Sequence, residues 1–262
     1  MSIGSHLEVL RQAIIRVLLV VGVLAIAVFC FKEETFQLLL APKESDFITF
    51  RAIEHLSDWL SAVTGSDLSF RFEPFRLHLI STELSAQFMT HLTTSLSLGA
   101  LLSSPYILFE LFRYITPALY ANERRHSVSI ALSCYVQFIL GVLMSYFILA
   151  PISFRFLGTY QVDPSVQNQI TLDSYISTFT GLTFAMGLVF QLPVVSWLLA
   201  RLGLLSARIM QQYRRHAIVI IMVVAAIITP PDIFTLLLVT LPLYLLYEVC
   251  IVIVARVNKA HS

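Results

Sequence analysis

The chain has 262 residues, of which 57% are hydrophobic and only 13% charged, and its formal net charge is +1. A soluble domain carries about 25% charged residues, and the apolar residues of this chain stand in runs too long for a soluble core. These numbers exclude an ordinary soluble protein. They predict a polytopic membrane protein in which residues 1–262 form one domain.

Six apolar segments follow one another along the chain. Bilayer hydrocarbon offers no water to the backbone, so a spanning segment is a helix or part of a closed barrel. These segments lack the alternating polarity of barrel strands, and we predict an all-α protein with six transmembrane helices. The first segment is about twenty residues long, whereas the apolar region of a secretory signal is shorter, so we expect it to be retained. The approximate ranges are 12–31, 87–112, 128–150, 175–200, 217–228 and 233–254.

The connections between these segments differ in charge. With six spans both termini share one side, where eleven Lys and Arg residues stand against two acids, Glu8 and Glu123. The opposite side holds six basic and twelve acidic residues. Because basic residues in short loops stay in the cytoplasm, we expect both termini inside and the loops 32–86 and 151–174 outside.

The last two spans are short. The apolar residues between His216 and Thr229 reach roughly 18 Å, and the stretch from Asp232 to Glu248 reaches about 24 Å, at 1.5 Å per residue. Because bilayer hydrocarbon is about 30 Å thick, we expect local thinning of the bilayer or burial of the polar helix ends against other helices.

Prolines interrupt the apolar segments. Pro105, Pro193 and Pro242 lie within predicted spans. An intramembrane proline frees a carbonyl group and bends its helix. Such bends fit either a bundle with concave walls or the ordinary packing kinks of a polytopic protein.

The outer loop contains a weakly amphipathic stretch. Its apolar residues recur at three- and four-residue steps, which predicts a helix lying on the outer face. A cap packed on the bundle, without a binding task, is the other interpretation. The apolar positions are Phe50, Ile53, Leu56, Leu60 and Val63.

Two separated strings carry the strongest functional signal. Residues 112–125, after the second span, read FRYITPALYANERR, in which Pro117 cannot continue an ordinary helix. Residues 229–232 read TPPD, and residues 242–248 read PLYLLYE. In this order the strings resemble those of the TatC family, the multispanning receptor of the twin-arginine protein export system. The resemblance covers nearly the whole chain except the outer stretch 44–77.

This resemblance implies a fold and a task. The six helices would form a concave, glove-like bundle in the bacterial cytoplasmic (inner) membrane. The protein would bind twin-arginine signal peptides of folded precursors at its cytoplasmic face. It would recruit single-span partners resembling TatA and TatB and further copies of itself, for export driven by the proton-motive force. Neither a catalytic activity nor a cofactor is implied, and we expect no nucleic-acid partner.

A twin-arginine signal presents two guanidinium groups, which are shaped for bidentate pairing with carboxylates. A receptor needs acids on an otherwise basic surface, where like charges reject generic basic peptides. Glu123 matches the family motif, although a water-exposed charge pair in a connector is its plainer interpretation. The residues that we assign to this site are Glu8, Leu10, Arg11, Glu110, Tyr114, Leu119, Tyr120, Glu123 and Arg124.

The identity of a second acid is open. Residues 6–11 read HLEVLR, with Val9 where the family usually has Glu. Glu8 lies one position earlier, turned about 100° in a helix, so it compensates only if the segment frays or rotates. Glu110 is the other candidate, unless it is an interfacial acid paired with Arg113.

A second polar group lies in the later spans. Thr229, Asp232 and Thr235 resemble the family's polar cluster where single-span partners dock, although Leu236 replaces a frequent Gln. Asp232 equally fits an N-cap of the sixth helix. Gln191 stands where the family commonly has Glu and takes up no proton. Its amide is open to a partner helix or to bonds between the chain's own helices.

A small-solute transporter is the main alternative. It needs ionisable groups near the membrane midplane, where this chain has the uncharged Gln191. An intramembrane enzyme is a third class, but no Ser/His, paired-Asp or metal-ligand constellation lies within the predicted spans. The sequence therefore favours a protein-export receptor.

Overall fold

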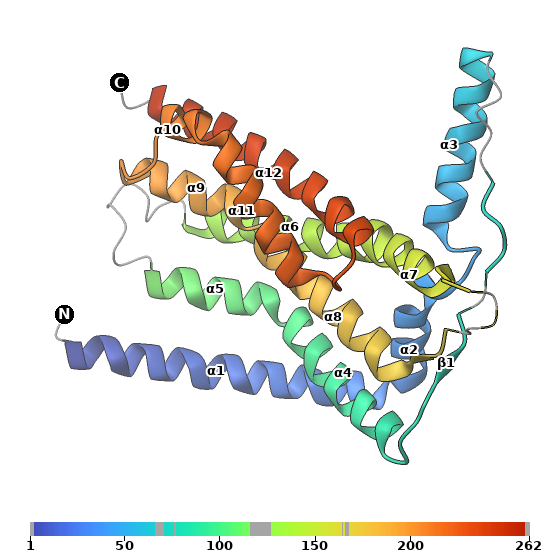
Figure 1. The fold of residues 1–262 in the computed structure, drawn as a ribbon. Coiled ribbons are helices and arrows are strands. Elements are labelled where there is room, and N and C mark those ends of the chain that lie inside the picture. Colours follow the sequence, from blue (N-terminus) through green and yellow to red (C-terminus); the bar gives the residue numbers. More distant parts are fainter. Residues whose placement is uncertain are drawn as a thin grey trace.

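The computed structural model describes residues 3–65, 71–75, 77–115, 127–163, 165 and 168–259. Helices make up most of the described chain, with one short pair of strands (Figure 1). The predicted helical class is therefore confirmed. In chain order the elements are α1 (Ile3–Cys30), α2 (Lys32–Leu40), η1 (Ala41–Lys43), α3 (Ile48–Thr64), β1 (Leu79–Ile80), α4 (Ala86–Leu102), α5 (Ser104–Ile115), α6 (Ser127–Met144), η4 (Ser145–Leu149), α7 (Ala150–Thr159), β2 (Ile170–Thr171), α8 (Leu172–Val189), α9 (Leu192–Arg201), α10 (Ala207–Gln212), α11 (Arg214–Ile228) and α12 (Ile233–Lys259).

Helical structure coincides with each predicted span. The six units are α1, the α4–α5 pair, the α6–η4–α7 run, the α8–α9 pair, α11 and α12. By length and apolar composition, four helices of the described chain are able to cross a membrane, and a fifth if the bent α4–α5 pair counts as one span. α11 has only 15 residues. Six membrane crossings therefore stay a prediction.

Prolines lie where several helices bend or loosen. The α4–α5 pair is bent by 51° across the break at Ser103, two residues before Pro105. Pro193 lies in the first turn of α9. Pro151 follows η4, a π-helical turn whose wider winding suits a residue without a backbone N–H. α12 instead runs through Pro242 without a break, so the expected bends form at some prolines and not at others.

Glycines set the spacing of neighbouring helices. A Cβ atom at Gly99 of α4 would lie 2.6 Å from the backbone nitrogen of Ala25 in α1. A Cβ atom at Gly141 of α6 would lie 2.5 Å from the carbonyl oxygen of Met186 in α8. In lipid, apolar side chains gain little by meeting one another, so close backbone packing holds helices together. The α1–α4 and α6–α8 contacts therefore depend on these two glycines.

One end of the bundle carries a cap, which is built from α2, η1 and the strand pair β1–β2 (Figure 1). The first residues of α1 and the last of α12 both lie at the opposite end, on different sides of the bundle (Figure 1). Within the cap, the buried Tyr175 hydroxyl donates to the carbonyl of Leu39 at 3.0 Å. The two strands pair in parallel, Leu79 with Ile170 and Ile80 with Thr171. The helix α3 leaves this cap crosswise to the spans and reaches beyond the bundle (Figure 1).

The guanidinium of Arg155 in α7 fixes α3 to the cap. Its central carbon lies 4.0 Å from the ring centre of Phe72, 5.2 Å from that of Phe75 and 5.5 Å from that of Phe50 in α3. Each cation–π contact of this kind contributes about 0.5–2 kcal/mol. The backbone N–H of Phe72 also donates to Glu54 Oε1 at 2.9 Å. Residues 71–75 therefore bind the base of α3 directly.

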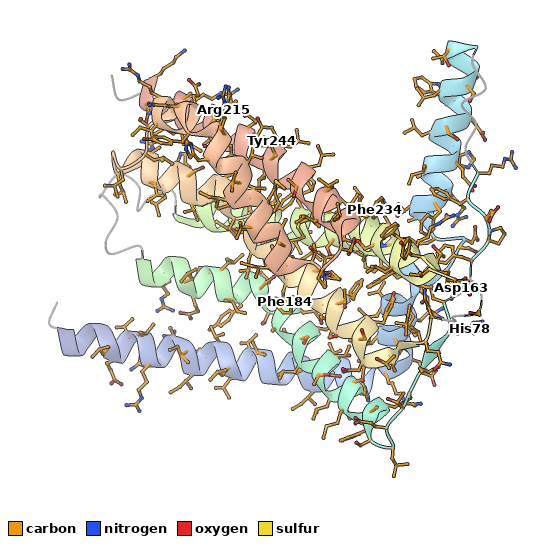
Figure 2. All side chains as sticks on the ribbon, in the orientation of Figure 1. His78, Asp163, Phe184, Arg215, Phe234 and Tyr244 are labelled. Atoms are coloured by element: carbon orange, nitrogen blue, oxygen red, sulfur yellow. The ribbon has the colours of Figure 1, made fainter. Side chains whose placement is uncertain are left out.

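Charge is distributed along the bundle as the sequence predicted. Arg215 lies toward the end that holds the chain termini, whereas His78 and Asp163 lie toward the capped end (Figure 2). Arg256 and Lys259 occupy the last turn of α12, at the first of these ends. We therefore call the end with the termini the basic end; which end faces the cytoplasm stays a prediction.

Replacement of Gly99 by Val tests the close contact between α1 and α4. The new side chain would meet the backbone of Ala25, so we expect a loss of about 1–3 kcal/mol in the free energy of unfolding. Thermal unfolding in detergent, followed by circular dichroism, measures this. Gly22→Val on α1 is the matched control, because a Cβ at Gly22 meets nothing within 4 Å. Equal losses in both variants would show that helix propensity, not close packing, matters at Gly99.

Candidate functional site

Glu110 of α5 is a buried carboxylate near the basic end. It is only 4% exposed. The Tyr106 hydroxyl, one helical turn earlier, donates to its Oε1 at 3.0 Å. Arg16 of α1 lies 3.3 Å from the same oxygen, and Arg113 lies 3.6 Å from it. One oxygen thus collects three partners from two helices.

This cluster holds α1 against α5. A buried charge is costly unless it is paired and hydrogen-bonded, and loss of one partner leaves the other uncompensated. Glu110 is therefore a paired and hydrogen-bonded carboxylate, not an isolated buried charge.

The sequence predicted the contact with Arg113 but missed Arg16. The available signal was a single arginine inside the first apolar segment, a position where a charge needs a partner. The sequence alone does not show how far α1 is shifted along α5, so it does not show which residue pairs with Arg16.

An apolar groove runs beside Glu110, between α1 and α5. Its volume is about 240 Å³. Apolar side chains form its walls, and Glu110 is the charged residue among those that line it. The lining residues are Leu10, Ala13, Ile14, Val17, Leu18, Ile107, Glu110 and Leu111. The groove therefore offers an apolar surface that Glu110 helps to line, while its carboxylate is held by Tyr106, Arg16 and Arg113.

The predicted residues of α1 divide between two faces. Leu10 lines the groove, whereas Glu8 and Arg11 are exposed and lie 3.7 Å apart as an ion pair. Val9 shares a face with Arg16, seven residues later, and that face is turned to α5. Because α1 is helical from Ile3 onward, Glu8 is rotated away from this face. The structure thus brings Leu10 and Glu110 together and does not bring Glu8 to them.

Several predicted residues lie outside the described part of the chain. Leu119, Tyr120, Glu123 and Arg124 fall in the gap at 116–126. Tyr114 lies in α5, but the position of its side chain is not among those described. The proposed role of these five residues stays a prediction.

Glu248 of α12 forms a second carboxylate cluster toward the basic end. Arg214 of α11 lies 2.7 Å from its Oε2, and the Tyr244 hydroxyl donates to its Oε1 at 3.0 Å. Tyr244 precedes Glu248 by four residues, the same spacing as Tyr106 and Glu110. The pairs α1–α5 and α11–α12 thus each carry an arginine–glutamate–tyrosine group. The sequence showed Glu248 within the PLYLLYE string but not its partner Arg214.

The polar residues at the opposite end are largely satisfied within the chain. Asp232 Oδ1 accepts from the backbone N–H of Thr235 at 2.6 Å, so Asp232 is the N-cap of α12. The Thr229 hydroxyl donates to the carbonyl of Ala225 at 2.9 Å. Asp232 Oδ2 and Thr235 Oγ1 are buried and have no hydrogen-bond partner among the described residues. Capping is confirmed, and the two buried oxygens beside it are unsatisfied within the described chain.

Gln191 joins two of the chain's own helices. Its Nε2 donates to the carbonyl of Cys134 in α6 at 3.0 Å. A longer contact, 3.4 Å, reaches the carbonyl of Gly187 in α8. The alternative of bonds between the chain's own helices is therefore confirmed, and a contact with a partner helix stays a prediction.

The fold and these clusters define a polytopic helical membrane protein with polar binding groups at the ends of its helices. Within the described ranges, no three His, Cys, Asp or Glu side chains gather as a metal ion requires. A family model described as Sec-independent protein translocase protein (TatC) matches residues 5–242. The chain therefore belongs to the TatC family and is a membrane component of a protein translocase.

Similar proteins extend over nearly the whole chain. The Sec-independent protein translocase protein TatC of Blattabacterium sp. subsp. Periplaneta americana (strain BPLAN) is 33% identical over 260 residues, covering 99% of this chain and 97% of that protein. TatC of Escherichia coli (strain K12) is 28% identical over 245 residues, covering 94% and 84%. A crystal structure of the twin-arginine translocase receptor TatC has a TM-score of 0.74 and 28% identity, covering 97% of this chain and 99% of that chain.

A double-mutant cycle on Arg16 and Glu110 tests the buried ion pair. Arg16→Met and Glu110→Gln remove the charges singly and together. We expect the sum of the two single losses in the free energy of unfolding to exceed the loss in the double variant by about 0.5–3 kcal/mol. The reason is that each single substitution leaves a buried partner unmatched. Chemical unfolding in detergent measures the cycle. Arg11→Met is the control, because the Arg11–Glu8 pair is exposed and such pairs contribute little. A coupling near zero would mean that Arg16 does not compensate Glu110.

Substitutions at Asp232 separate capping from charge. Asp232→Ala is expected to cost about 1 kcal/mol of stability, because the Thr235 N–H loses its acceptor. Asp232→Asn is expected to leave stability nearly unchanged, since Asn caps a helix as well as Asp. The unfolding midpoints of the two variants give the answer. If Asp232→Asn lost as much stability as Asp232→Ala, the negative charge and not the capping hydrogen bond would be responsible.

Proposed function

We propose that this chain binds twin-arginine signal peptides of folded precursor proteins at the basic end of its bundle. The supporting observation is the buried Glu110 carboxylate, which borders an apolar groove where α1 meets α5. Carboxylates pair bidentately with guanidinium groups. The surrounding basic residues repel peptides that are merely cationic, which adds selectivity.

The two parts of the groove match the two parts of a signal peptide. A signal peptide carries a charged segment followed by an apolar one. In the proposed complex, Glu110 and Glu123 receive the arginines, and the leucine and isoleucine side chains of the groove receive the apolar segment. Tyr114, Leu119, Tyr120 and Arg124 belong to the same connector region. Glu8 and Arg11, which form an exposed ion pair on another face of α1, would contribute long-range charge.

The proposed task requires a defined orientation. In our proposal the chain forms one domain with six spans in the bacterial cytoplasmic membrane, with both termini in the cytoplasm and a concave face between the helices. The basic end would then be cytoplasmic, as basic residues in short loops favour. α11, with its 15 residues, reaches about 22 Å at 1.5 Å per residue, so the bilayer beside it would be thinned.

Single-span partners resembling TatA and TatB are proposed to dock on the later helices. The support is the pair of buried, unpartnered oxygens on Asp232 and Thr235, together with Thr229 nearby. In lipid, an interhelical hydrogen bond contributes about 0.6 kcal/mol on average. Gln191, already bonded within the chain, would contribute through its carbonyl oxygen. Signal-peptide binding would nucleate this assembly, with further copies of the chain, for export driven by the proton-motive force.

A photo-crosslinker placed at Glu123, and in a second variant at Glu8, tests the recognition site. Membranes with either variant are challenged with a twin-arginine precursor and with its twin-lysine counterpart. We expect strong labelling of the first precursor only, because Lys lacks the planar fork that pairs with carboxylates. Equal labelling of the two precursors would refute the assignment of these acids.

The small-solute transporter is discriminated by deletion. A strain without this chain should fail to export twin-arginine precursors while solute uptake is unchanged, with export restored by a plasmid copy. A plasmid copy that combines Glu110→Gln, Glu123→Gln and Glu8→Gln is expected not to restore export. If it did restore export, the three acids would not be needed for the mechanism. Lost solute uptake with intact export would favour the transporter.

A further inference from the structure

The helix α3 carries a broad apolar face that nothing in the described chain covers. Ile48, Leu56, Trp59 and Val63 are 54%, 56%, 60% and 63% exposed. Their spacings of eight, three and four residues place them on one side of the helix. Scattered apolar side chains are normal at a surface, but a continuous stripe containing Trp marks a contact surface. We call this stripe the apolar face of α3.

The other sides of α3 have different surroundings. Phe50 and Ser57 are 1% and 9% exposed and face the cap. Arg51 and Asp58 are exposed on the side between the cap and the apolar face, where Arg51 lies 3.4 Å from Asp46. Because Arg155 and residues 71–75 hold the packed side, the rotation of α3 about its axis is fixed.

The first turn of α3 shows where the apolar face points. The Thr49 hydroxyl donates to the backbone carbonyl of Phe147 in η4. Leu56 and Val63 follow Thr49 by seven and fourteen residues, so all three lie on nearly the same side of the helix. The apolar face therefore looks back toward the run α6–η4–α7 from which Phe147 projects, and not away from the membrane-spanning helices.

The apolar face continues a surface that the spans already present. Phe147 and Ile148, in the turn η4 between α6 and α7, are 38% and 40% exposed. Phe47, just before α3, stacks on Phe147 with ring centres 6.0 Å apart. Exposed apolar side chains of a membrane span meet lipid. The same lipid is therefore beside α3, which extends sideways past the bundle at this level (Figure 1).

We propose that α3 lies in the headgroup boundary of the bilayer, on the capped side of the membrane, with its apolar face in the acyl chains. The partner is the lipid surface of the membrane that the chain itself spans. Trp favours this boundary because its ring is apolar and its N–H is polar. α3 contains one arginine, Arg51, and His55, which is neutral at pH 7, against Glu54 and Asp58. Burial of apolar area and not attraction to anionic lipid therefore holds it.

Trp59 is a built-in probe of this contact. The chain has two tryptophans, Trp59 on α3 and Trp197 on α9. The Trp197→Phe variant is reconstituted in phosphatidylcholine vesicles whose acyl chains carry bromine near the headgroup or near the chain end. We expect at least a twofold loss of Trp59 emission with shallow bromine, a smaller loss with deep bromine, and little quenching by aqueous iodide. The quenching of Trp59 is also obtained without the Trp197→Phe substitution, by subtracting the emission of the Trp59→Phe variant from that of the wild type.

A tryptophan on the charged side of α3 is the matched control. Asp58→Trp, combined with Trp59→Phe and Trp197→Phe, should be quenched by iodide and not by brominated lipid. Leu56→Asp should release Trp59 from the lipid, whereas Ala62→Asp, on the charged side, should not.

Three results would overturn the proposal. The first is iodide quenching of Trp59 equal to that of the control, which would mean that the face meets water. The second is protection of Trp59 from iodide that rises with the protein density in the vesicles, without quenching by brominated lipid. That would mean that a second copy of the chain covers the apolar face. The third is quenching that requires anionic lipid, which would mean that charge holds the helix. Added phosphatidylserine is therefore expected to change nothing.

Discussion

The structure depends on one constraint: polar groups inside the apolar helices must be satisfied by the protein itself, because lipid offers no hydrogen bonds. Glu110 meets it with Tyr106, Arg113 and Arg16, and thereby joins α5 to α1. Gln191 meets it through the carbonyl of Cys134 and joins the α8–α9 pair to α6. Polar residues therefore select which helices touch, and glycines then determine how closely the backbones approach.

The two ends of the bundle use polar groups differently. At the basic end, carboxylates are paired with arginines from neighbouring helices, as in the Glu248–Arg214 pair. At the capped end, aromatic rings surround Arg155, and Tyr175 is hydrogen-bonded to the backbone. The first arrangement joins neighbouring helices through ion pairs, whereas the second builds a rigid platform. The signal-peptide binding proposed above uses the basic end, and the proposed lipid contact of α3 uses the capped end.

Local patterns in the sequence predicted much of this fold. Apolar runs located the helices, Pro105 located the bend between α4 and α5, and the position of Asp232 after two prolines identified a helix cap. Contacts between distant segments were not predictable, because they depend on how far one helix slides along another. Arg16 as the partner of Glu110 and the direction of the apolar face of α3 are of this kind. In the site, Leu10 and Glu110 line the same groove, whereas the binding role assigned to them stays a prediction.

The pairing of Glu110 with Arg16 has a consequence for release of a bound peptide. In the free protein this carboxylate is already neutralised, so an incoming guanidinium that takes the place of Arg16 exchanges one ion pair for a similar one. Such an exchange leaves the net charge of the buried position constant and yields only the difference between two nearly equal energies. In the proposed complex, tethered Arg16 would stay close by and compete for its old position. Occupancy would then be readily reversible, as a receptor that hands its cargo onward requires.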